Sequence, residues 1–186
     1  MTDDEKYVRN AIKTHVWSGF YDQADTEQMM EEILEGEVDP EEMRRFIVSE
    51  SAAKAAAEKS WPAETDCDRL DQIFTALDAA GICSLQNAGY TMSDGHSDIG
   101  EKLDERGMKN FHGYCFYHGQ DLERAVNGEG LMLAFSDLKA DPANKTKVGH
   151  EICAIVEKAG FKTNWNGDPE TRITIPKFDW KRRTPR

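Results

Sequence analysis

The sequence predicts an α+β fold: a mixed, partly parallel sheet of about five strands, covered by helices and preceded by an N-terminal helical segment. Apolar residues recur at helical spacing through residues 1–62, which contain no strand-like run. From residue 63 onward, short apolar runs alternate with helical patterns. Long connections that contain a helix separate several of these runs, so parallel pairing is allowed.

The N-terminal domain, residues 1–62, is expected to be helical. Its first helix carries an apolar stripe with one histidine on it: Val8, Ala11, Ile12, His15 and Val16. Residues 25–28 resemble a capping box for a second helix, which Gly36 would end. Residues 39–40 are an Asp-Pro pair typical of a helix start, and Pro62 would end the helix that follows.

The second domain, residues 63–186, is expected to hold the sheet. Its helices are predicted at residues 65–81, 97–107, 120–126 and 141–160. Its strands are predicted at residues 82–86, 112–118, 131–135, 161–165 and 172–176. The last two strands would form a hairpin around the turn at 166–170.

The charge is strongly acidic and uneven. The formal net charge is −12, which disfavours nucleic acid and anionic membranes as partners. Residues 22–43 contain no Lys or Arg but ten acidic residues: Asp22, Asp25, Glu27, Glu31, Glu32, Glu35, Glu37, Asp39, Glu41 and Glu42. This acidic block is either a solvated helix face or a surface for a basic partner. The polar, acidic start of the chain predicts a cytoplasmic protein.

Several kinds of chemistry have no sequence support. The cysteines Cys67, Cys83, Cys115 and Cys153 lack zinc-ligand spacing and are expected to be reduced. Neither a phosphate-binding glycine loop nor a nucleophile elbow occurs in the sequence. We therefore expect no cofactor.

Polar residues follow the first two predicted strands. If those strands are parallel, their carboxyl ends lie at one edge of the sheet, where open α/β sheets bind ligands. The candidate ligand-binding residues are Gln86, Asn87, Tyr90, Thr91, Asp94, His96, His118, Gln120, Asp121 and Arg172. Arg172 either pairs with an acidic neighbour or recognises an anion with its guanidinium fork. Trp180 is expected to pack over the sheet.

A metal site is the sharpest chemical hypothesis at this edge. Its candidate ligands are Asp94, His96, His118 and Asp121. The alternative is that His118 and Asp121 only organise the turn from a strand into a helix, where the helix dipole favours an acidic residue. His112 cannot share a metal with His118, because the strand between them spans about 20 Å.

Residues 65–186 resemble an uncharacterised bacterial family, defined by a domain of unknown function. The resemblance rests on residues 77–95, 113–126, 130–137, 148–175 and 180–183. The stretches F-Y-H-G-Q-D and W-x-G-x-x-x-x-R-I within them are the most distinctive. The resemblance implies a grouping and no mechanism, and it leaves the first 60 residues outside.

Three functions compete on this reading. The leading one is a non-catalytic binding or regulatory domain for an unknown protein or small-molecule ligand. The second is a metal-assisted hydrolase, in which His118 with Asp94 or Asp121 holds the metal and Arg172 steadies an anionic substrate. The third is a structural homodimer that pairs through the last strand or the helical segment.

Overall fold

The computed structural model describes residues 1–34, 38–139 and 141–184. It divides the chain into two compact units. The helical unit comprises Met1–Thr65 together with Trp180–Arg186, and the sheet unit comprises Asp66–Asp179. The predicted boundary near residue 62 lies close to the observed one, but the C-terminal residues belong with the helices.

The helical unit contains α1 (Asp3–Ser18), α2 (Gln23–Ile33) and α3 (Pro40–Glu58). Apolar residues at helical spacing form its core, so the predicted periodicity is confirmed. The buried members are Val8, Ile12, Val16, Met30, Val38, Met43 and Ile47. As predicted, Asp39 caps α3 and Pro40 follows it, with the Asp39 carboxylate accepting from the Glu41 N–H at 2.9 Å.

The start of α2 differs from the prediction. The capping box is formed by Asp22 and Asp25, each of which accepts from the backbone N–H of the other. The helix therefore begins before the predicted box at 25–28, because an Asp can take either position of the motif. The predicted stop at Gly36 lies outside the described residues.

The C-terminal segment is an integral part of the helical unit. Trp180 is buried, and its Nε1 donates to the carbonyl of Ser18 at 3.0 Å. Gly19, with φ 77°, lies so close to this segment that a Cβ there would be 2.4 Å from the carbonyl oxygen of Arg182. The prediction that Trp180 packs over the sheet is therefore wrong: the indole covers the end of α1.

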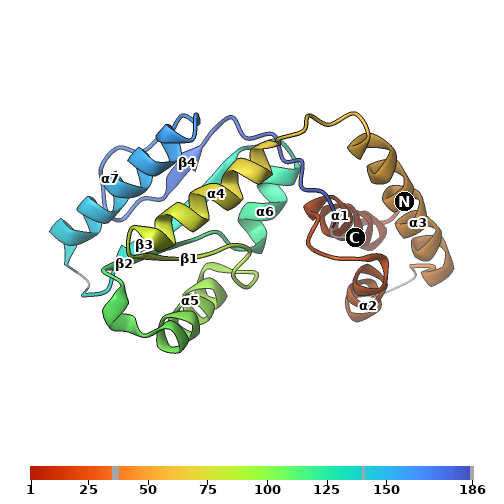
Figure 1. Ribbon diagram of the computed structural model, residues 1–186. Helices are drawn as coiled ribbons and strands as arrows, with labels where there is room; N and C mark the ends of the chain where they lie inside the picture. Colours follow the sequence, from red (N-terminus) through yellow and green to blue (C-terminus); the bar gives the residue numbers. More distant parts are fainter. Residues whose placement is uncertain (35–37, 140, 185–186) are drawn as a thin grey trace. The chain divides into compact units, whose positions relative to one another are not determined.

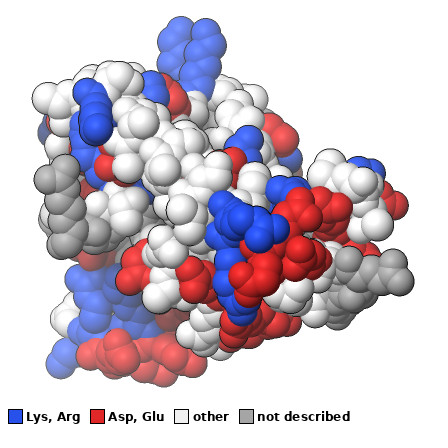
Figure 2. Space-filling model, turned by 90° about the vertical axis from the view of Figure 1, so that its right-hand side faces the viewer, with Lys and Arg blue, Asp and Glu red and all other residues white. Residues whose placement is uncertain are grey.

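Arginines partly neutralise the acidic block. Arg44 lies 2.8 Å from Glu31 and 2.5 Å from Glu41, and Arg9 pairs with Glu42. Figure 2, which looks onto the right-hand side of Figure 1, accordingly shows acidic and basic side chains side by side. The surface is therefore mixed in charge where Glu31, Glu41 and Glu42 pair with arginines of α1 and α3.

The sheet unit alternates helices and strands. In chain order it comprises α4 (Asp66–Ala79), β1 (Ile82–Leu85), α5 (Met92–Arg106), the 3-10 turn η1 (Met108–Asn110), β2 (Gly113–Phe116), α6 (Gly119–Val126), β3 (Leu131–Asp137), α7 (Pro142–Lys158) and β4 (Ile173–Ile175). Figure 1 shows α4 and α7 on one face of the sheet and α5 on the other.

The described strands form one mixed sheet in the order β1-β2-β3-β4. Strands β1 and β2 are parallel, as predicted, with Leu85 opposite Phe116. Strands β2 and β3 are antiparallel, as are β3 and β4. The α+β class and the mixed, partly parallel sheet are confirmed.

The sheet has four strands in the described part of the chain, fewer than predicted. Residues 161–165 do not form a strand. Only Asn164 pairs there, exchanging two backbone hydrogen bonds with Thr174 at 2.8 and 3.1 Å. Trp165 instead turns its Nε1 to the carbonyl of Asp168 and packs its ring on Phe135. Side-chain packing therefore limits the predicted hairpin to a single bridge.

Candidate functional site

The segments that follow β1 and β2 lie side by side, as the parallel pairing requires. The N–H of Ala88 donates to the carbonyl of Tyr117 at 2.9 Å, and the N–H of Gly119 donates to the carbonyl of Gly89 at 2.9 Å. The N–H of Gln120 donates to the carbonyl of Tyr90 at 3.2 Å. This backbone ladder confirms that the two predicted polar segments share one edge of the sheet.

A buried polar cluster lies at this edge, made of His118, Asp121 and Arg172. Asp121 is only 1% exposed, and its Oδ1 accepts from Arg172 Nη1 at 2.7 Å. Its Oδ2 lies 3.2 Å from His118 Nε2 and accepts from the His118 backbone N–H at 3.4 Å. The carboxylate therefore joins the start of α6 to Arg172, the residue before β4. Of the two predictions for Arg172, pairing with an acidic neighbour is confirmed.

His118 is a neutral histidine with one poorly satisfied nitrogen. Burial lowers the pKa of His118; Asp121 opposes this shift and Arg172 adds to it. Nε2 lies 3.2 Å from Asp121 Oδ2 and 3.4 Å from Arg172 Nη1. Because the contact with the carboxylate is the shorter one, we assign the proton to Nε2, which leaves Nδ1 as an acceptor. Nδ1 is buried and forms no well-aligned hydrogen bond within the described residues, although the His118 side chain faces the backbone N–H of Asp121 in a capping box at the start of α6. His118 and Asp121 therefore organise the turn from β2 into α6, as the alternative to a metal site predicted, and Nδ1 is left with only a weakly aligned donor.

Thr91 and Asp94 belong to a helix cap rather than to a loop. Helix α5 begins at Met92, and Thr91 caps it. Asp94 Oδ2 accepts from the Thr91 N–H and from the Thr91 hydroxyl, both at 2.9 Å. These hydrogen bonds lower the pKa of Asp94. The predicted helix start at residue 97 was wrong because the Thr-x-x-Asp capping box was not recognised.

His96 is directed away from His118. It lies on α5, where its Nδ1 is 3.2 Å from the Tyr114 hydroxyl and its ring meets Phe116 edge-on. Burial lowers the pKa of His96, and Lys145 lowers it further. Gly95 lets α5 approach this part of the sheet, since a Cβ there would lie 2.3 Å from the Phe116 ring. His96 thus packs on the aromatic face of β2.

The other candidates hold the edge together rather than meet at one point. Gln86 donates to Asp71 at 2.7 Å and accepts from the Tyr117 hydroxyl at 3.0 Å. The exposed Tyr90 donates its hydroxyl to Glu123 at 3.1 Å. Asn87 has φ 50°, a left-handed conformation that Asn tolerates well, and it turns the chain after β1. Gln120 is exposed at the start of α6.

The four predicted metal ligands do not form one ligand set. Over the described ranges, no group of three or more His, Cys, Asp or Glu side chains is arranged to hold a metal ion. Asp121 is bonded to Arg172, and Asp94 to Thr91. His118 and Asp121 are the only two of the four in direct contact within the part of the chain that the structure describes.

The cysteines behave as small buried side chains. All four are free thiols; Cys67, Cys83 and Cys115 are buried and Cys153 is half-buried. Burial raises the pKa of Cys115 most, and it also raises the pKa of Cys83 and Cys153. The prediction that the cysteines are reduced and structural agrees with this arrangement.

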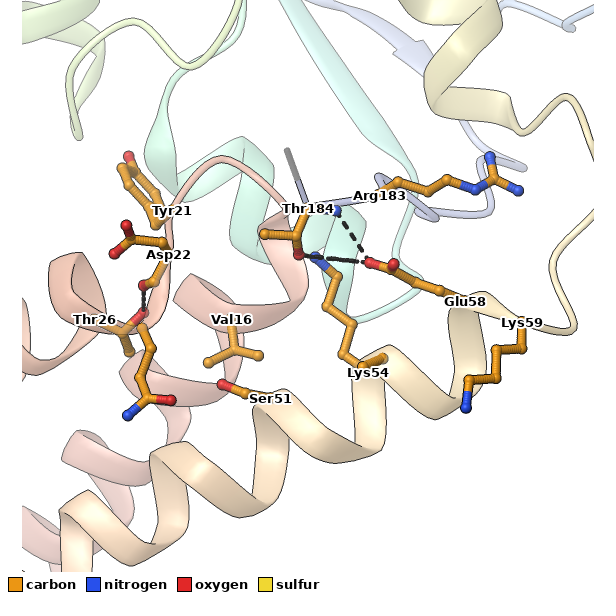
Figure 3. Close-up of a pocket in the computed structure, with 12 residues that line it drawn as sticks. Val16, Tyr21, Asp22, Thr26, Ser51, Lys54, Glu58, Lys59, Arg183 and Thr184 are labelled. Atoms are coloured by element: carbon orange, nitrogen blue, oxygen red, sulfur yellow. Dashed lines mark hydrogen bonds and ion pairs between the residues drawn. The ribbon is translucent and has the colours of Figure 1, made fainter. Parts of the chain in front are cut away.

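The helical unit has a cavity of its own, of about 510 Å³. Figure 3 shows Lys54 extending from α3 toward Thr184 of the C-terminal segment. The buried Lys54 Nζ donates to Thr184 Oγ1 at 2.6 Å and lies 3.6 Å from Glu58. Glu58 also accepts from the Thr184 N–H at 3.0 Å. These bonds fix the C-terminal segment beside α3.

Sequence reasoning missed Lys54 entirely. It lies in an alanine-rich stretch that resembles an ordinary exposed helix face. The only local signal was its spacing of four residues from Glu58, which is common on solvated helices. Its burial depends on Thr184, which is far away in sequence.

None of the helices in the described ranges is long and apolar enough to cross a bilayer. No curated protein and no solved structure matches the chain significantly. A family model for a domain of unknown function, DUF6891, matches residues 1–184. The expectation that the first 60 residues lie outside the family resemblance was therefore wrong, because helical periodicity there carries no distinctive motif. With nearly its whole length covered by this match, the chain belongs to the DUF6891 family of domains of unknown function.

Proposed function

We propose that this protein is a non-catalytic ligand-binding domain whose site lies at the carboxyl edge of the sheet, at His118 and Arg172. The ligand is a small molecule with an anionic group for Arg172 and a hydroxyl or N–H donor for His118. Ligand sites of open α/β sheets lie at this kind of edge.

The exposed guanidinium of Arg172, next to the poorly satisfied Nδ1 of His118, carries the proposal. A buried acceptor that has only the weakly aligned N–H of Asp121 costs stability, so its presence beside a cluster of charges favours a binding role. A ligand hydroxyl or N–H would satisfy this atom. The neutral state of the ring matches that role, since only neutral imidazole has an acceptor nitrogen.

Arg172 supplies the complementary charge. Its side chain is 32% exposed, whereas that of Asp121 is 1% exposed. Arg172 donates to Asp121 through Nη1. A guanidinium has five N–H donors, so Arg172 has further N–H groups that Asp121 does not take up. A carboxylate or phosphate oxygen fits these donors.

The engagement of the nearby carboxylates favours binding over catalysis. Asp121 neutralises Arg172 and Asp94 caps α5, so neither carboxylate is placed as a free base. Metal-assisted hydrolysis remains a separate prediction, tested by the metal content of protein purified without chelator. A homodimer is tested by sedimentation.

A thermal-shift screen tests the binding site. The probes are hydroxycarboxylates and phosphate monoesters, applied to the natural protein and to the variant Arg172→Lys. Lysine keeps the charge opposite Asp121 but loses the fork. We expect at least one probe to raise the melting temperature of the natural protein and to have little effect on the variant.

Arg124→Lys is the matched control, because Arg124 lies on α6 and pairs with Glu129 at 3.1 Å on the surface. The control should respond like the natural protein. If no probe stabilises the protein, or if a probe stabilises all three forms equally, the proposed site is wrong.

A further inference from the structure

A second concave surface lies in the sheet unit, at the end of β2 that begins with Gly113. It is a groove of about 600 Å³. Its apolar lining includes Phe111, Leu138 and Val148, together with Met108, which is 50% exposed. We call it the lysine groove, because Lys109, Lys139 and Lys147 also line it. His118 follows the other end of β2, so the lysine groove is separate from the proposed ligand site.

Three lysines give the groove its charge. Lys109 comes from η1, Lys139 from the connection after β3, and Lys147 from α7. All three are exposed, and none forms an ion pair within residues 1–34, 38–139 and 141–184. On a chain with net charge −12, lysines gathered without acidic partners are unusual.

The acidic residues of the groove are already engaged. Asp137 is buried, and its carboxylate accepts from the N–H groups of Lys139 at 3.2 Å and Asp141 at 3.1 Å. Glu151 lies 2.9 Å from the Nε2 of His112. Because Glu151 is 46% exposed, an incoming group would meet three exposed lysines and one carboxylate, so positive charge is in excess in the groove.

We infer that the lysine groove binds an acidic segment of a partner protein, with an apolar side chain among its acidic ones. The three lysines belong to three different parts of the fold and are therefore spread along the groove. This arrangement suits a peptide with several negative charges better than a single small anion. The exposed Met108 and the apolar lining suit a side chain such as leucine. This inference does not depend on the proposed ligand site.

Fluorescence anisotropy with a synthetic peptide tests the inference. The probe is a fluorescein-labelled peptide of glutamates with leucines among them, and the full chain is titrated into it. Replacing the groove lysines together, as Lys109→Gln, Lys139→Gln and Lys147→Gln, should weaken binding about tenfold, because several small charge contacts are lost at once. Met108→Ser should weaken it about threefold through lost apolar contact.

The matched control removes the same charge elsewhere in the sheet unit. Lys158→Gln, Lys162→Gln and Lys177→Gln alter exposed lysines that do not line the groove. The control variant should bind within about twofold of the natural protein, since a distant surface charge is screened. Equal loss in both triple variants would reveal non-specific attraction and overturn the inference.

Two further results would also overturn it. One is the absence of peptide binding by the natural protein. The other is displacement of the peptide by tripolyphosphate as readily as by unlabelled peptide, which would assign the groove to a small anion instead.

Discussion

Arg172, the residue before β4, holds its Nη1 2.7 Å from the Oδ1 of Asp121 on α6. The two residues are far apart in sequence, and the carboxylate is buried while the guanidinium reaches the surface. Asp121 also accepts from the backbone at the start of α6, so one side chain joins a helix start to the residue before the last strand. The pair therefore supports the sheet edge at which we place the ligand.

Breaking this pair should destabilise the sheet unit. Arg172→Gln leaves the buried Asp121 charge without its counter-ion, and we expect a loss of about 3 kcal/mol in the free energy of unfolding. Urea denaturation followed by circular dichroism measures it. The double variant Asp121→Asn with Arg172→Gln removes both charges and should cost less than the sum of the single changes.

The control for that series is Arg124→Gln. Arg124 pairs with Glu129 on the surface, where both side chains are about half exposed, so the change should cost less than about 1 kcal/mol. Equal losses for Arg124→Gln and Arg172→Gln would contradict the structural role given to Asp121.

Trp180→Ala should destabilise the helical unit although the residue is near the C-terminus. The substitution removes a buried indole and its hydrogen bond to Ser18, at a cost of about 3 kcal/mol. Hydrogen exchange resolves the effect by region. Amides of α1 and α3 should exchange faster, while those of β1 to β3 should keep their protection. Equal acceleration in both units would contradict the assignment of Trp180 to the helical unit.

The four thiols should react slowly with Ellman's reagent in the native state. Burial raises the pKa of Cys83, Cys115 and Cys153, so little thiolate forms near neutral pH. Cys153 should react first because it is half-buried, whereas the other three are buried. All four should react at once in guanidinium chloride. If the native Cys153→Ser variant still reacted rapidly with the reagent, another thiol would be the accessible one, and this order would be contradicted.

Much of this fold was predictable because local patterns dominate it. Helical stripes, the Asp39–Pro40 start of α3 and the parallel pairing of β1 with β2 all follow from short-range rules. The failures occurred where distant contacts decide. Trp180 packs on α1, and Trp165 packs on Phe135, neither of which periodicity can indicate.

The candidate site was predictable in part. Topology places His118 and Asp121 beside the segment after β1, and the ladder of backbone hydrogen bonds bears this out. Sequence could not show that Arg172 would take the Asp121 carboxylate, because that depends on the register of β4. Sequence reasoning also missed the lysine groove, because its lysines come from three separate parts of the chain.

His15 should make the stability of the helical unit depend on pH. Burial lowers the pKa of His15 to about 4, against the opposing effect of Asp25. Its Nδ1 lies 3.0 Å from Thr26 Oγ1, and its ring stacks on Tyr21. In the unfolded chain the His15 ring takes up a proton near pH 6.5. In the folded chain the same ring stays neutral down to about pH 4. The stabilisation is therefore complete above about pH 6.5 and is lost as the pH falls toward about 4.

Urea unfolding followed by tryptophan fluorescence tests this dependence, since Trp17, Trp61 and Trp180 all belong to the helical unit. The natural protein should lose about 2 kcal/mol more than His15→Gln between about pH 7.5 and pH 5. His112→Gln is the control, because His112 is exposed beside Glu151, and it should follow the natural protein. Parallel pH profiles for the natural protein and His15→Gln would show that His15 is not the buried neutral group described here.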